Sequence, residues 1–233
     1  MDAEYRDRAV CIDGTLVLAD LHFGKGEAST VEFPVGAGED CVERLRGLLD
    51  YFDPEAVVLA GDVFHSFDYV PDSADEALAG TARAVRDAGA RLVVVEGNHD
   101  TMLDTAYAGD LHDEYVMDTD GDETVVVCHG HEEPETAADS YVVGHDHPAI
   151  EIEGQKRPCF LVGDGAYRRS DVLVVPSFNR LVAGVSVNGR LGSTRPELSP
   201  LVTGIAQYRP VVFDEESEET LTFPPLGRFS RML

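Results

Sequence analysis

Aspartate, asparagine and histidine side chains recur in five short motifs, each of which directly follows a run of apolar residues. The motifs are Asp20-Leu21-His22, Gly61-Asp62, Gly97-Asn98-His99-Asp100, His129-Gly130-His131 and Gly144-His145-Asp146-His147. Their side chains offer oxygen and nitrogen donors and no thiolate. Such a set suits Mn, Fe, Zn or Mg better than it suits a structural zinc–cysteine site. The sequence therefore predicts a centre for divalent metal ions.

The apolar run before each motif is typical of a buried β-strand, because it is short, continuous and bounded by glycine or polar residues. These runs are residues 16–19, 57–60, 92–95, 125–128 and 141–143. In open α/β sheets, ligands gather just beyond the carboxyl ends of the strands. Five strands that end in this way are expected to bring the motifs to one point in space.

Helical periodicity is confined to the first half of the chain. Residues 39–52 carry apolar side chains at helical spacing, and a capping-box pattern from Ser73 to Glu76 predicts a second helix that ends near Ala88. After residue 110 short strands dominate, at 114–117, 149–152, 159–162, 172–175, 181–187 and 208–213, and an acidic run at 214–219 is expected to be solvated. We expect one α/β domain over residues 1–233, with antiparallel strands completing the sheet.

Negative charge is the strongest bulk property of the chain. Lys and Arg total 18 and Asp and Glu total 44, which gives a net charge of −26. Such an excess repels itself in dilute buffer and suits a salt-rich cytoplasm, where the Debye length falls to about 3 Å at 1 M salt. We therefore expect a halophilic source, such as a haloarchaeon. The charge argues against a broad basic face for nucleic acid, although metal ions bind phosphates locally.

Composition also sets the expected compartment. No stretch approaches the roughly 20 apolar residues of a membrane span, and the polar residues 1–9 lack the apolar core of a secretory signal. We expect a cytoplasmic protein with no membrane partner. The four cysteines have no CxxC spacing and are expected to be reduced core residues.

The donor atoms divide into two groups of ligands. Asp20, His22 and one histidine of the last motif suit one ion, and Asn98, His129 and the other histidine of that motif suit a second. Asp62 has two oxygens and is expected to bridge both ions. Two metals about 3.5–4 Å apart clamp a phosphoryl group for in-line displacement, and a bridging hydroxide is the expected nucleophile.

His99 follows a candidate ligand directly and is expected at the rim, where a phosphoester would lie. It is the candidate general acid for the leaving group, or a positive clamp on the phosphoryl oxygens. Asp100 is expected to hold its other ring nitrogen. Three further residues keep open roles: Lys25 is a phosphate contact or a solvated charge, and His65 and His131 line the site or flank it.

The order of the five motifs over residues 16–147 resembles the calcineurin-like metallophosphoesterase superfamily. This resemblance implies a β-sandwich flanked by helices, in the four-layer order αββα, with two metal ions at one edge. It implies that the first ion binds Asp20, His22 and His147 and that the second binds Asn98, His129 and His145. Asp62 would be shared between them, and His99 would have the catalytic role.

A finer resemblance rests on Leu18-Ala19-Asp20-Leu21-His22-Phe23-Gly24-Lys25-Gly26, Arg157-Pro158-Cys159-Phe160 and Pro176-Ser177-Phe178. These segments are similar to the ICC-like phosphoesterases, which include bacterial ligase-associated endonucleases. The resemblance implies phosphodiesterase or DNA endonuclease activity. We therefore expect a phosphodiesterase with two divalent ions, Mn²⁺ before Fe, Zn or Mg, that acts on DNA or nucleotides. The alternatives are a phosphomonoesterase or small-nucleotide phosphatase, and a non-catalytic scaffold of the same fold.

Overall fold

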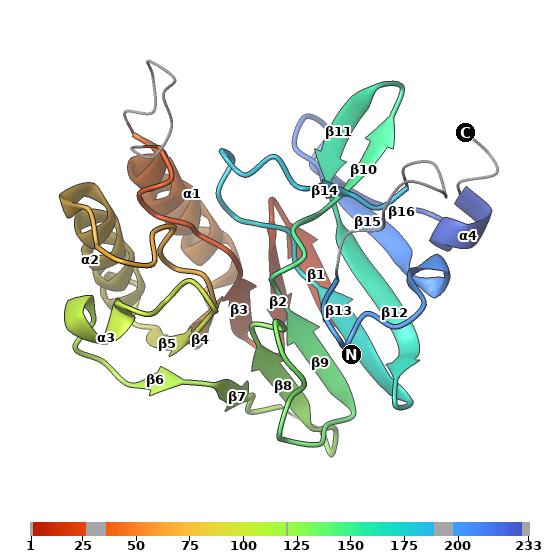
Figure 1. Ribbon diagram of the computed structural model, residues 1–233, viewed down its shortest axis with the longest axis horizontal. Coiled ribbons are helices and arrows are strands. Elements are labelled where there is room, and N and C mark those ends of the chain that lie inside the picture. Colours follow the sequence, from red (N-terminus) through yellow and green to blue (C-terminus); the bar gives the residue numbers. More distant parts are fainter. Residues whose placement is uncertain (1, 27–35, 120, 189–197, 230–233) are drawn as a thin grey trace.

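The computed structural model describes residues 2–26, 36–119, 121–188 and 198–229, and two mixed β-sheets packed on each other form its centre (Figure 1). The first sheet runs in the order β1 (Ala3–Arg6), β2 (Ala9–Ile12), β3 (Thr15–Leu18), β4 (Ala56–Ala60), β5 (Arg91–Val95) and β6 (Leu111–His112). The strands from β3 to β6 are parallel to one another, and β1, β2 and β3 pair antiparallel. Strands β2 and β3 form a hairpin whose two-residue turn is Asp13-Gly14.

Strand β4 shows why the central runs are apolar at every position. Val58 and Ala60 face the second sheet, whereas Val57 and Leu59 face the helices on the other side. Both faces of the strand are therefore covered, and no position reaches water. A parallel strand buried on both faces has this continuous pattern rather than an alternating one.

Helices α1 (Ala37–Phe52) and α2 (Asp72–Asp87) cover the outer face of the first sheet (Figure 1). The short helix α3 (Leu103–Ala106) adds Leu103 to the same buried cluster. Both long helices were predicted, but the predicted cap of α2 is wrong. Pro71 occupies the N-cap position and no side chain caps the helix, so Ser73 lies within the first turn. A proline before the first turn suits this position because the first helical N–H groups have no partner within the helix.

The second sheet runs in the order β16 (Glu219–Thr222), β15 (Arg209–Asp214), β12 (Phe160–Tyr167), β13 (Ser170–Val174), β9 (Ser140–Val143), β8 (Val125–Cys128) and β7 (Glu114–Val116). Strands β8, β9 and β13 are parallel, and the remaining pairs are antiparallel, as predicted. Strand β16 was not predicted. All its residues are exposed, so it lacks the apolar pattern that marks a strand in a sequence.

The outer face of the second sheet carries a mixed layer. This layer holds a small sheet of β11 (Gln155–Pro158), β10 (Pro148–Ile152) and β14 (Val185–Ser186), the 3₁₀ turn η1 (Ile205–Gln207) and helix α4 (Leu226–Phe229). The fold is thus an α/β sandwich of mixed sheets with flanking helices, which confirms the predicted class. The fourth layer is only partly helical in the described residues, because the second half of the chain has few helix-forming segments.

Two expectations from composition concern bulk properties. All four cysteines are free, and Cys41, Cys128 and Cys159 are buried, so they act as small core residues. Cys11 is only partly buried and packs against the cluster below helices α1 and α2. Among the described helices, none combines the length and the apolar character that a membrane crossing requires.

Candidate metal centre

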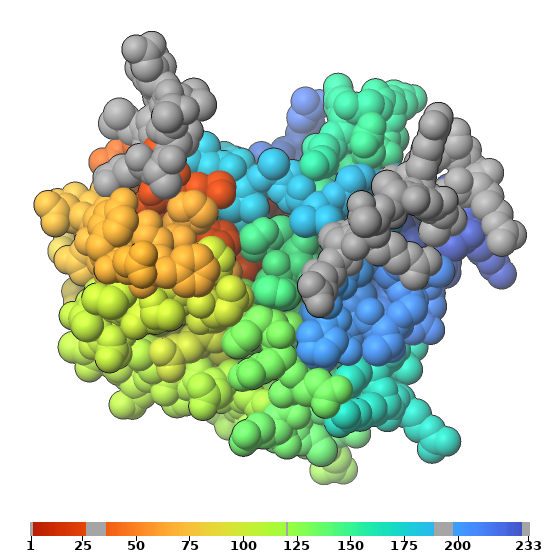
Figure 2. Space-filling view, in the orientation of Figure 1, coloured from red at the N-terminus to blue at the C-terminus, as the bar shows by residue number. Residues whose placement is uncertain are grey.

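The five motifs converge at one edge of the sandwich, as their strands predicted. Strands β3, β4 and β5 are parallel neighbours in one sheet, and β8 and β9 are parallel neighbours in the other. The two sheets are tied together at this edge, because the backbone N–H of His145 donates to both carboxylate oxygens of Asp20, at 3.2 and 3.0 Å. In the space-filling view, early, middle and later segments of the chain meet near the centre of this face (Figure 2).

The first group of donors contains Asp20, His22, Asp62 and His147. The Nε2 atom of His147 lies 3.1 Å from Oδ1 of Asp20, and it lies 3.2 Å from Nε2 of His22. Nε2 of His22 is also 3.6 Å from Oδ2 of Asp62. One donor atom from each of the four residues lies within 4.8 Å of the others, a spacing that one metal ion can span.

The second group gathers around His129. Its Nε2 atom lies 3.1 Å from Oδ1 of Asn98, 3.2 Å from Nδ1 of His145 and 3.4 Å from Oδ1 of Asp62. Asp62 therefore turns one oxygen toward each group. The structure brings all seven candidate ligands together, and it places His147 in the first group and His145 in the second.

The two carboxylates are buried among imidazoles and backbone N–H groups. Asp20 is 0 % exposed and Asp62 is 2 % exposed. Burial raises the pKa of Asp62. Burial also acts to raise the pKa of Asp20, but His147, His129 and His22 together outweigh it and lower that pKa. Burial lowers the pKa of His22 to about 3 and that of His145 to about 4, so both imidazoles are neutral at pH 7. Neutral imidazole is the form that binds metal.

The donor set fits divalent cations. Nδ1 of His129 lies 3.2 Å from the carbonyl oxygen of Ala60, its natural hydrogen-bond acceptor. With the ring proton there, the Nε2 lone pair points at the oxygen of Asn98 and toward Asp62. Lone pairs that face one another in a buried site are unfavourable unless a cation lies between them. The mixture of carboxylate, amide and imidazole ligands suits Mn, Fe or Zn.

The backbone is strained at five of the candidate ligands. Their φ angles lie in the left-handed region: Asp20 at 55°, His22 at 42°, Asp62 at 48°, His145 at 66° and His147 at 44°. Non-glycine residues there cost on the order of 1–3 kcal/mol each and cluster at functional sites. The surrounding fold holds five side chains in orientations that an unstrained loop would not select.

Two glycines allow the close approach of the loops. A Cβ atom on Gly97 would collide with the backbone nitrogen and the Oδ1 atom of Asp62. A Cβ atom on Gly61 would enter the ring of His129, and its φ of 80° is also unfavourable for other residues. The glycines in the motifs are therefore needed for space as well as for turning the chain.

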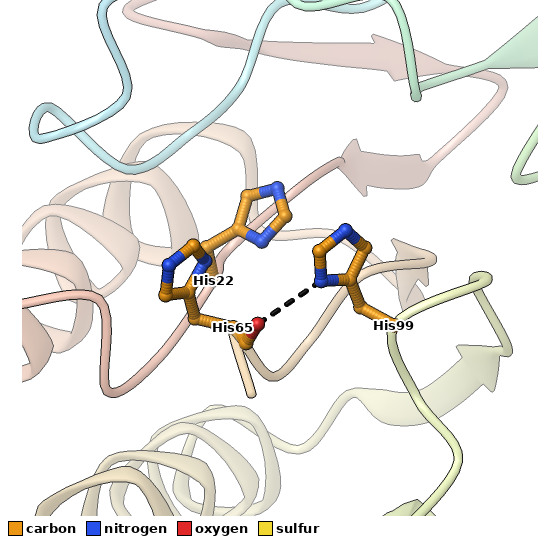
Figure 3. Close-up of side chains that lie close together, drawn as sticks. All are labelled: His22, His65 and His99. Carbon is orange, nitrogen blue, oxygen red and sulfur yellow. Dashed lines mark hydrogen bonds between the residues drawn. The ribbon is translucent and has the colours of Figure 1, made fainter. Parts of the chain in front are cut away.

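His99 contacts the shared carboxylate. Its backbone N–H donates to Oδ1 of Asp62 at 3.0 Å, and its Nε2 lies 3.9 Å from Oδ2 of the same residue. Nδ1 of His99 donates to the carbonyl oxygen of His65 at 3.0 Å (Figure 3), and Nε2 is the ring nitrogen on the side of Asp62. The side chain is 23 % exposed, so the ring reaches the surface.

The expected contact between Asp100 and His99 is wrong. The Asp100 carboxylate accepts hydrogen bonds from the backbone N–H groups of Val63 at 3.2 Å, Phe64 at 3.0 Å and Gly97 at 2.9 Å. Burial raises its pKa to about 6. Asp100 thus joins the loops that follow β4 and β5, and a backbone carbonyl takes the place beside His99 that the sequence assigned to it.

The residues with open roles lie at different distances from the centre. The ring of His65 faces that of His99 at a centroid distance of 6.1 Å and lies edge-on to His22 at 5.5 Å, so it lines the site (Figure 3). Burial is the main cause that lowers the pKa of His65, and the positive charge of Lys25 is the second. The ammonium group of Lys25 therefore lies close enough to interact with His65. His131 flanks the second group, with its ring 5.3 Å from that of His129.

Two buried polar residues that sequence reasoning missed fix the loop of the first motif. Ser177 donates from Oγ to the carbonyl oxygen of Asp20 at 2.7 Å. Asn179 donates from Nδ2 to the carbonyl oxygens of Leu21 at 2.7 Å and His22 at 3.3 Å. The signal was present, because these residues also follow an apolar strand, β13.

Two arginines support the 177–179 segment from the other side. Arg8 donates to the carbonyl oxygens of Ser177 at 3.3 Å and Asn179 at 3.2 Å. Arg44 of helix α1 donates to the carbonyl oxygen of Phe178 at 2.7 Å and stacks on its ring at 4.0 Å. The backbone of the metal loop is thus braced through two layers of hydrogen bonds.

One family profile and two solved structures are similar to this chain. A family profile described as "Calcineurin-like phosphoesterase" matches residues 15–148, which include all five motifs and more than half of the chain. The nuclease MPE of Pseudomonas putida has a similar structure, with a TM-score of 0.54 and 23 % identity over 88 % of each chain. The phosphoesterase YfcE of E. coli has a TM-score of 0.47 and 13 % identity, over 91 % of this chain and 98 % of that one. Among curated proteins, none matches this chain.

Removal of the Asn179 amide tests the bracing of the first motif. We expect Asn179→Ala to weaken metal binding by roughly 10-fold, since groups that orient metal ligands typically contribute a factor of 10–100 to affinity. Calorimetric titration with Mn²⁺ measures the effect. Asn188→Ala is the matched control, because Asn188 is also buried and bonds the backbone of Glu151 instead. Equal metal affinity in the two variants would contradict the bracing role.

Proposed function

Because the chain belongs to the calcineurin-like phosphoesterase family, we propose that it hydrolyses phosphodiester bonds at a dinuclear metal centre. The family is one of metal-dependent phosphoesterases, and the buried cluster of Asp and His side chains is intact here. The observation that carries the proposal is the position of Asp62, with one oxygen facing each group of donors and His99 beside it. An intact cluster argues against the alternative of a non-catalytic scaffold.

The proposed ligands follow from the two groups of donor atoms. Asp20, His22 and His147 would hold one ion, and Asn98, His129 and His145 would hold the other, with Asp62 between them. When bound, two such ions supply an activated water and neutralise charge on the phosphoryl oxygens. We propose Mn²⁺ as the metal, because hard oxygen donors are combined with imidazoles and no thiolate is present.

His99 is the proposed proton donor to the leaving group. Its Nδ1 proton is held by the carbonyl oxygen of His65, so a proton on Nε2 is the one available for transfer. That nitrogen lies on the side of Asp62, where the scissile bond of a substrate bound between the donor groups would lie. We propose that Asp100 acts as a positioning residue, since its carboxylate touches only backbone N–H groups in the described contacts.

Charge favours small or nucleotide-sized diesters over long duplexes. In the described part of the chain, four surface arginines, Arg157, Arg168, Arg180 and Arg209, each pair with a carboxylate. This pairing reduces the positive charge that these four arginines offer to a polynucleotide backbone. The Pseudomonas putida protein is named a nuclease, and its likeness to this chain concerns the fold. Nuclease activity is one form of the diesterase activity proposed here.

Two proposals concern the setting of the protein. Residues 1–233 would form one domain, because the cluster between the two sheets joins β2–β5 with strands as late as β15. We also propose a cytoplasmic location in a salt-rich organism, since the net charge of −26 needs screening.

Replacement of His99 tests its role as acid. We expect His99→Ala to keep both metal ions and to lose activity by about 10²–10⁴-fold, the usual contribution of a general acid. Elemental analysis and hydrolysis of bis-p-nitrophenyl phosphate provide the two readouts. His112→Ala is the control, because this histidine lies on strand β6, outside the cluster. Loss of metal together with activity would show that His99 is a ligand or a structural residue.

Paired synthetic substrates test the reaction class. We expect the Mn²⁺-loaded protein to hydrolyse bis-p-nitrophenyl phosphate faster than p-nitrophenyl phosphate, because the monoester adds a negative charge next to a strongly acidic protein. Single-stranded and duplex DNA then define the substrate range. Turnover of the monoester alone would overturn the diesterase assignment and favour the phosphomonoesterase alternative.

Salt dependence tests the halophilic setting. We expect the thermal unfolding midpoint to rise with KCl and to level off near 1 M, where the Debye length is only about 3 Å. The physical reason is screening of carboxylate repulsion across the surface. Scanning calorimetry from 0.05 to 3 M KCl provides the measurement. Equal stability across this range would count against a salt-rich cytoplasm.

A further inference from the structure

An exposed aromatic loop lies beside the proposed acid. Phe67 and Tyr69 follow His65 in the segment between β4 and α2, and they are 45 % and 55 % exposed. Single exposed apolar residues are common and need no explanation. The position of Phe67 is more specific, because its ring packs on that of His99 at a centroid distance of 4.0 Å and an interplanar angle of 31°.

Two hydrogen bonds fix the backbone of this loop. The carbonyl oxygen of His65 accepts the hydrogen bond from Nδ1 of His99 at 3.0 Å. The carbonyl oxygen of Phe67 accepts a hydrogen bond from Oγ1 of Thr101 at 2.5 Å. These two hydrogen bonds join the segment that carries Phe67 to the loop that carries His99 at two points. A ring fixed before binding loses little entropy when a ligand stacks on it.

The direction of the leaving group brings it to this ring. Under the proposed function, the leaving oxygen receives its proton from Nε2 of His99, which faces Asp62. The group attached to that oxygen must then pass the His99 ring on its way out of the buried cluster. Phe67 packs on that ring and remains nearly half exposed, so it offers a flat apolar surface at this point.

We infer that Phe67 forms a stacking subsite for a planar aromatic leaving group, and that a nucleobase is its occupant. This inference rests on the proposed function and narrows its substrate class to nucleotide diesters. Aromatic side chains bind bases through their faces, without regard to base identity. Asp68, exposed between the two aromatic residues, disfavours a second phosphate at this place and leaves an uncharged ring as the better occupant.

A purely structural role of Phe67 makes a different prediction. If the ring only holds His99 in its rotamer, its removal changes the handling of every phosphoester equally. If the ring binds the leaving group, its removal affects ligands with a base and spares those without one. The ratio of affinities between two ligands with the same phosphate therefore separates the two roles.

The experiment is a calorimetric titration of the Mn²⁺-loaded protein with adenosine 5′-monophosphate, phenyl phosphate and ribose 5-phosphate, with phosphate release followed in parallel. We expect the nucleotide to bind about 10-fold more tightly than ribose 5-phosphate, a typical effect of stacking one base. Phe67→Ala should remove this preference and leave ribose 5-phosphate binding within about twofold, and Phe67→Trp should increase the preference. Phenyl phosphate binding as tight as the nucleotide would assign the subsite to simple aryl groups and overturn the nucleobase as occupant.

The control is Tyr51→Ala, which removes an aromatic side chain of similar exposure, 52 %, from helix α1. It should leave all three affinities unchanged. Equal binding of the nucleotide and ribose 5-phosphate to the unmodified protein would overturn the inference. Equal weakening of both by Phe67→Ala and Phe67→Trp would do the same. If none of the three ligands binds, the inference fails. The proposed function fails as well only if bis-p-nitrophenyl phosphate is not hydrolysed, so the two failures are distinguishable.

Discussion

The burial of two carboxylates among imidazoles is the constraint on which this structure depends. Asp20 and Asp62 are almost completely removed from water. A buried carboxylate is costly unless cations or hydrogen-bond donors surround it. The Nδ1 atom of His129 faces the carbonyl oxygen of Ala60, so its Nε2 faces the oxygens of Asn98 and Asp62 as a lone pair. The arrangement is favourable chiefly when divalent cations occupy the space between the two donor groups, so metal binding and the stability of this edge are expected to be coupled.

The fold meets this constraint by bracing loops instead of relying on side chains alone. The backbone N–H groups of His145 and His99 donate to the carboxylates of Asp20 and Asp62. Asp100 and Asn179 bind backbone groups of neighbouring loops. These bonds compensate the left-handed backbone at the ligands, which an isolated loop would not retain. A centre built in this way is preorganised, and preorganised polar groups contribute most to catalysis.

The overall charge and the local chemistry of the site point in different directions, and together they narrow the function. A chain with a net charge of −26 repels long polyanions in dilute solution. The proposed dinuclear centre would nevertheless attract a single phosphoester strongly at short range. The exposed face of Phe67 adds an uncharged contact next to His99. A small ligand with one phosphate at the centre and a flat ring beside it satisfies all three features.

The sequence by itself determined the five strands, their motifs and the mixed character of the second half. Continuous apolar runs and the residues that end them are local signals, and every candidate ligand lies in one of them. Sequence reasoning from donor atoms alone left His145 and His147 interchangeable between the two groups, and only the packing of the two sheets separated them. It also assigned Asp100 to His99, whereas the partner is the backbone carbonyl of His65. A carbonyl group is present at every residue and leaves no mark in a sequence, so contacts of this kind are decided only when the loops are folded against one another.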